Sequence, residues 1–114
     1  MLAPMKYACL SALLWVANLA AAADGPWPID AEFWAAPRSG PTVVAEPALR
    51  AAVATLLQRE PDSRLLIRYP GGETGQLWAQ ELSAWLIALG IPSRRIETQP
   101  GGVGDDQLLL SVVP

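Results

Sequence analysis

Two stretches with the apolar periodicity of helices alternate in this chain with short apolar runs, and this alternation constrains the fold more than any other feature. The first helix is predicted over residues 47–59, where apolar side chains recur at helical spacing. Pro47 suits a first helical turn, because its missing N–H would have no partner there. Glu60 and Pro61 end the helix, since proline disfavours helical geometry in the residue before it. The apolar stripe consists of Leu49, Val53, Leu56 and Leu57.

The second helix is predicted to begin at Thr74 or Gly75 and to end at Leu89. Its apolar residues recur at steps of three and four and form a wide face. Gly90 suits the left-handed residue that often terminates a helix, and Pro92 follows shortly after it. The face consists of Trp78, Leu82, Trp85, Leu86 and Leu89.

Short apolar runs between turn signals predict the strands. Residues 64–69 are long enough for a strand that is buried within a sheet. Further strands are expected at residues 94–98 and 107–113, with antiparallel directions. The glycine-rich segment 100–106 is predicted to join these two strands as a hairpin with a long loop.

The first strand has two candidates. Residues 29–34 are flanked by prolines, which sheets tolerate at strand ends and edges, and residues 42–45 form a shorter apolar run. Segment 24–41 is therefore an edge strand or a Pro- and Trp-rich leader, docked or free, and residues 42–114 form the α/β domain. The order β-α-β-α-β-β predicts an α/β fold of the α+β type, a two-layer sandwich with two helices on one face of a mixed sheet.

The first 23 residues have the organisation of a secretory signal peptide. Lys6 supplies the positive charge, residues 7–19 form the apolar region, and alanines at 21–23 suit the cleavage site. Cleavage is expected after the last of these alanines or the one before it. The alternative is an uncleaved anchor, although the apolar run is shorter than the roughly 20 residues that span a bilayer. Cys9 precedes most of the apolar run, so we expect no lipid attachment.

The mature chain lacks the usual catalytic groups. The sequence contains no histidine, and its one cysteine belongs to the signal peptide, which excludes a Ser-His-Asp triad, a thiolate nucleophile and a His or Cys zinc site. Without Lys6, seven arginines face 11 acidic residues, and this acidic balance argues against nucleic acid as a partner. We therefore expect that the protein is not an enzyme, that it binds no cofactor or metal, and that it does not span a membrane after signal cleavage.

Three passages of the chain resemble the OmpA-like, peptidoglycan-associated periplasmic domain. In that family a helix leads through a Pro-Asp-x-Arg turn into a strand, and a later helix ends in Gly-Ile-Pro-x-x-Arg-Ile. The resemblance covers roughly residues 33–113, and it implies the family's β-α-β-α-β-β fold and a periplasmic location. The passages are Pro47–Val53, Glu60–Ile67 and Leu89–Ile96.

The wall-binding loop of that family differs here. The family holds the diaminopimelate of peptidoglycan with the aspartate of a Gly-His-Thr-Asp loop and with an arginine on the following helix. In this chain residues 68–73 read Arg-Tyr-Pro-Gly-Gly-Glu, and Leu77 and Trp78 stand near the position of the arginine. The resemblance therefore implies the scaffold, and it carries over no wall-binding residue.

The junction at residues 69–75 is the most suggestive candidate site. A strand runs there through glycines into a helix start, and the free N–H groups of a helix N-terminus attract anions. An arginine before the loop could hold a carboxylate through two hydrogen bonds. The alternative is a tight turn in which the side chain of Glu73 or Thr74 caps the helix. The candidate ligand-binding residues are Arg68, Gly71, Gly72, Glu73 and Thr74.

The acidic residues give a weaker indication of a functional site. Glu73, Glu81, Asp105 and Asp106 have no spacing that would force two of them together as a hydrolase pair. Because a calcium site needs more oxygen ligands at alternating positions, residues 101–106 are expected to form a solvated hairpin tip.

The tryptophans divide into two groups. Trp78 and Trp85 lie seven residues apart on one predicted helix face and are expected in the core. Trp27 and Trp34 lie in the proline-rich segment, where they either anchor a partner protein or fold back over the core.

These observations predict an exported, non-enzymatic binding or assembly module that acts through protein–protein contacts in the cell envelope. The expected location is the periplasm, with secretion as an alternative. The second interpretation is a module that binds peptidoglycan or another anionic envelope ligand at the Gly71–Thr74 loop.

Overall fold

The computed structural model describes residues 24–114, so the predicted signal peptide lies outside the described residues. The elements follow one another in the order β-α-α-α-β-α-β-β, with a short 3₁₀ turn, η2, before the third strand. The bounds are β1 (Trp27–Asp30), α2 (Ala31–Ala35), α3 (Gly40–Ala45), α4 (Pro47–Gln58), β2 (Arg64–Tyr69), α5 (Glu73–Ala88), η2 (Ser93–Arg95), β3 (Ile96–Pro100) and β4 (Gln107–Val113).

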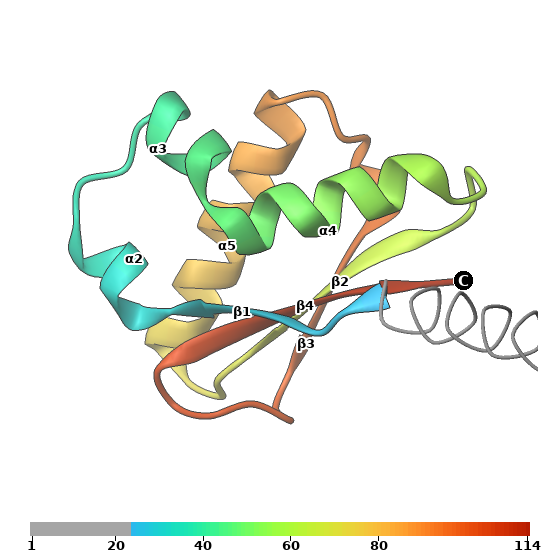
Figure 1. The fold of residues 1–114 in the computed structure, drawn as a ribbon. Helices are drawn as coiled ribbons and strands as arrows, with labels where there is room; N and C mark the ends of the chain where they lie inside the picture. The colour runs from blue at the N-terminus through green and yellow to red at the C-terminus, as the bar shows by residue number, and fades with distance from the viewer. Residues whose placement is uncertain (1–23) are drawn as a thin grey trace, which may run out of the picture.

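The four strands form one mixed sheet in the order β1-β4-β2-β3. Strand β4 is antiparallel to both of its neighbours, and β2 is parallel to β3. Helix α4 packs on β1, β4 and β2, and helix α5 packs on β2 and β3, so both helices cover one face (Figure 1). The predicted α+β sandwich with two main helices on one face of a mixed sheet is confirmed.

The core lies between this sheet face and the two helices. Alternate residues of β4 are buried, as expected of a strand with one covered face. The opposite face carries Arg64, Arg68 and Glu97, and none of the helices within residues 24–114 lies over it (Figure 1). The buried core residues of the main elements are Leu49, Ala52, Leu56, Leu65, Ile67, Ala79, Leu82, Leu86, Leu108, Leu110 and Val112.

The first strand differs in extent from the prediction. Strand β1 occupies the sheet edge, as proposed for residues 29–34, but it begins at Trp27, and the chain turns into α2 at Ala31. The alternative strand at residues 42–45 is wrong, because these residues belong to α3. Ser39 and Thr42 form a reciprocal capping box there, and a proline stands in the first helical turn.

The predicted hairpin between the last two strands is also wrong. Strand β2 lies between β3 and β4, so residues 101–106 cross over β2 instead of forming a hairpin tip. The burial of the strands explains the order, because β4 buries three large apolar residues and takes an inner position, whereas β3 is mostly polar and suits an edge. Strand β3 also begins two residues later than predicted. The Arg95 guanidinium holds η2 by donating to the carbonyl oxygens of Ser63 and Leu56, each at 2.9 Å.

Candidate binding surfaces

The glycine loop before α5 is exposed, as the predicted anion site requires. Gly72 is the N-cap residue, with a φ of 102° that favours glycine, and no side chain of the described residues caps the helix. The prediction that Glu73 or Thr74 caps it is therefore wrong. Glu73 instead stands in the first turn, where its negative charge occupies the region that an anion would enter.

Arg68 lies away from this helix start. Its register partners in the sheet are Leu109 and Gln99, which places its side chain on the face opposite the helices. There it approaches Gly102, where a Cβ atom would lie 3.3 Å from Arg68 Nη1. The two parts of the predicted anion site, the guanidinium and the helix N-terminus, thus lie on different faces of the sheet. Anion binding at this loop stays a prediction.

The tryptophans of the leader are packed against the domain. The Trp34 side chain is only 8% exposed, and its ring stacks on Trp78 with centroids 6.0 Å apart. The Arg38 guanidinium covers the same ring at 5.3 Å. Trp27 is half-buried and packs against the core from β1. This segment is therefore docked, and contact of these two tryptophans with a partner stays a prediction.

The four acidic candidates do not converge. Glu73 begins α5, Asp105 and Asp106 lie in the loop before β4, and Glu81 binds Arg38. No group of three or more potential metal ligands occurs within residues 24–114.

Glu81 has a structural role. The Arg38 guanidinium donates to both of its carboxylate oxygens, with the Nη2 contact at 2.9 Å, and the Trp85 indole donates to it at 3.3 Å. The hydrogen bonds from Arg38 lower the pKa of Glu81 more than its partial burial raises it. The same pair raises the pKa of Arg38. This ion pair ties the segment after α2 to the middle of α5.

The lowered pKa predicts how acid weakens the domain. Below about pH 4.3 the unfolded chain protonates Glu81 first, so protons favour the unfolded state, and the contribution of Glu81 disappears as the pH falls through its folded pKa. We expect Glu81→Gln to be less stable than the unchanged protein at neutral pH and the difference to narrow in acid. Urea unfolding at several pH values measures this, and a constant difference would contradict it.

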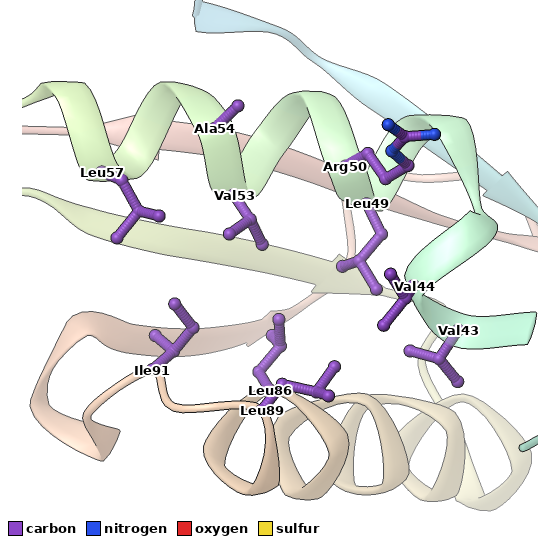
Figure 2. A pocket seen from close by; sticks show the side chains of 10 residues that line it. All are labelled: Val43, Val44, Leu49, Arg50, Val53, Ala54, Leu57, Leu86, Leu89 and Ile91. Carbon is purple, nitrogen blue, oxygen red and sulfur yellow. The ribbon is translucent and has the colours of Figure 1, made fainter. Parts of the chain in front are cut away.

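An apolar groove runs between α4 and α5. Its volume is about 380 Å³. Leu49, Val53 and Leu57 point from α4 toward Leu86 and Leu89 at the end of α5 (Figure 2). Val43 and Val44 of α3 close one end, and Ile91 lies toward the other, as Figure 2 shows.

Large apolar side chains line this groove without being covered. Leu57 is 63% exposed, Val44 51% and Leu89 47%. Contiguous exposed apolar surface on a small protein is typical of an interaction site. The only charged residue of the lining is Arg50, whose guanidinium is turned away from the apolar side chains (Figure 2). Arg50 belongs to none of the ion pairs found within the described part of the chain, which join Arg38 to Glu81, Arg59 to Asp24 and Arg64 to Glu97.

The groove was not predicted from the sequence, although the apolar pattern of α4 carries a signal for it. The periodicity places Leu57 and Leu89 in the core-facing stripes, because both fall at helical spacing from buried residues. The stripe of α4 is wider than one sheet face covers, and its outermost residue, Leu57, is left on the surface. An apolar stripe wider than its buried face indicates such a surface.

No family model matches this chain, and neither a curated protein nor a solved structure matches it significantly. The resemblance to the OmpA-like domain and the periplasmic location therefore stay predictions. Within residues 24–114, no helix combines the length and the apolar character needed to cross a membrane.

Proposed function

We propose that this chain is an exported, non-enzymatic binding module of the cell envelope, and that it binds a partner protein through the groove between α4 and α5. The observation that carries the proposal is the uncovered apolar lining at Leu57, Val44 and Leu89. Leaving such side chains in water gives up the stabilisation that their burial would bring, about 25 cal/mol per Å². A partner that covers them recovers this stabilisation on binding.

The shape of the groove favours an amphipathic helix as the occupant. Two helices form its walls, and helices dock in such grooves with apolar residues at steps of three and four. Arg50 at the α3 end provides one positive charge without an ion-pair partner among the described residues. We therefore expect a partner helix with an apolar stripe and an acidic residue near one end, within reach of this guanidinium.

Site-specific photo-crosslinking in producing cells tests this function. A photoreactive residue at Leu57 or Leu89 of the full chain is expected to give a discrete adduct with one other protein. The matched control is Leu77, which is 58% exposed on α5 and lies outside the groove. Arg50→Glu is expected to reduce the adduct at least about threefold, since it replaces an attractive charge contact with a repulsive one. Equal adducts from Leu77, or no protein adduct from either groove position, would refute the proposal.

A further inference from the structure

The free edge of the sheet at β3 offers a second interaction surface. Among the described strands, β3 pairs with β2 alone and ends the sheet on that side (Figure 1). The Gly101 N–H, directly after β3, donates to the Tyr69 carbonyl at 2.8 Å. Because backbone groups alternate in direction along a strand, the N–H and C=O groups of Gln99 and Glu97 also point toward β2. The N–H and C=O groups of Thr98 and Ile96 therefore point away from the sheet.

The other sheet edge, β1, is much less able to pair with an added strand. The Ala31 N–H donates to the Asp106 carbonyl at 2.7 Å. By the same alternation, the backbone groups of Pro28 and Asp30 point away from the sheet. Pro28 has no N–H to offer, and α2 begins directly after Asp30. An added strand would find almost no donors there. The two edges are thus different, and only β3 has a donor and an acceptor at its centre.

A groove of about 330 Å³ runs beside β3, between this strand and α5. Thr98 lines it from the strand, and Gln80, Ala84 and Ile87 line it from the helix. None of its lining residues is charged. Ile87 is 49% exposed and offers apolar area next to the open edge. A neighbouring strand and its helix can approach this side without burying a charge.

We propose that β3 pairs with β3 of a second copy of this chain, in an antiparallel dimer that joins two sheets into one of eight strands. A two-fold axis at Thr98 lets the two Thr98 residues exchange both backbone hydrogen bonds. It also places Ile96 opposite Pro100, whose carbonyl accepts from the Ile96 N–H. Pro100 therefore costs this register little, although its own N–H is missing.

The side chains favour the same register. With the axis at Thr98, threonine faces threonine, and Glu97 faces Gln99 on the open face, so each cross-strand pair is neutral or hydrogen-bonding. An axis at Glu97 would place two carboxylates directly opposite each other, which is destabilising. The register at Thr98 leaves both α5 helices on the same layer, where Ile87, Ala84 and Gln80 line the junction. This complementarity to itself is why a second copy fits the edge.

Sedimentation equilibrium of the protein as purified from producing cells, over a hundredfold range of concentration, tests this proposal. The unchanged protein is expected to dimerise. Thr98→Lys and Ile87→Lys are expected to raise the dissociation constant at least about tenfold, because both place like charges at the junction. Leu77→Lys, which changes a residue of similar exposure on the same helix outside the groove beside β3, is expected to leave dimerisation unchanged.

A protein that stays monomeric at every concentration, or a dimer that neither charged variant weakens, would overturn the proposal. Circular dichroism verifies that each variant is folded, and Ile87→Lys decides the outcome if Thr98→Lys does not fold. Leu57→Asp separates this inference from the proposed function. That variant should lose the crosslinked partner and keep the dimer, because Leu57 is on α4 and lines the other groove.

Discussion

Replacing Gly75 with alanine is expected to lower the free energy of unfolding by about 3 kcal/mol. A Cβ atom on Gly75 would lie 2.1 Å from the carbonyl oxygen of Pro70, far inside van der Waals contact. Both residues are buried, and Gly75 lies in the first turn of α5. Neither α5 nor the loop can relieve the overlap without disturbing the packing of α5 on the sheet. Urea unfolding measures the loss.

Gly71→Ala is the matched control for this substitution. Gly71 is in the same loop, but no described atom beyond its two chain neighbours lies within 4 Å of its Cβ position. We expect Gly71→Ala to change the free energy of unfolding by less than about 0.5 kcal/mol. Equal losses in the two variants would mean that flexibility of the loop, and not the close approach to Pro70, requires the glycine at position 75.

Leu56→Ala is expected to cost about 3 kcal/mol, because Leu56 is fully buried and its truncation leaves a cavity under α4. Typical domains are stable by only about 5 to 15 kcal/mol, so this one change removes a large part of the stability. The thermal midpoint and the urea midpoint should both fall. A loss below about 1 kcal/mol would contradict the assigned position of Leu56 in the core.

The neighbouring residue provides the control. Leu57→Ala makes the same chemical change one position along α4, where the side chain is mostly exposed. We expect its free energy of unfolding to change by less than about 0.5 kcal/mol. In the crosslinking experiment the same variant, with the photoreactive residue at Leu89, should lose most of the adduct. The comparison of Leu56→Ala with Leu57→Ala thus distinguishes an effect on stability from an effect on partner binding.

The sequence predicted best those elements whose local pattern agrees with their place in the fold. Strand β2 and strand β4 have the predicted bounds, because turn residues bracket each apolar run. Helix α4 ends one residue earlier than predicted, and α5 begins one or two residues earlier and ends one residue earlier than predicted. In each case an apolar stripe faces the sheet, so local periodicity and burial give the same answer.

The errors arose where tertiary packing decided between alternatives. Val43 and Val44 favour a strand by composition, yet the capping box at Ser39 begins a helix, and burial of Val43 fixes it against the core. Strand pairing cannot be deduced from the adjacency of β3 and β4 along the chain, because the inner place goes to the strand with the more apolar face. The shapes of the two grooves depend on how α5 is spaced from α4 and from β3, and the wide apolar stripe of α4 indicates an exposed apolar surface without giving these spacings.

Strand β4 is synthesised last of the four strands, yet it takes an inner position between β1 and β2. Until residues 107–113 are available, β1 has no strand to pair with, and the covered face of the sheet lacks Leu108, Leu110 and Val112. The contacts that complete the sheet therefore join the two ends of the domain, and such long-range pairings form late. We therefore expect a chain with this topology to complete its sheet only after its final strand has emerged from the ribosome.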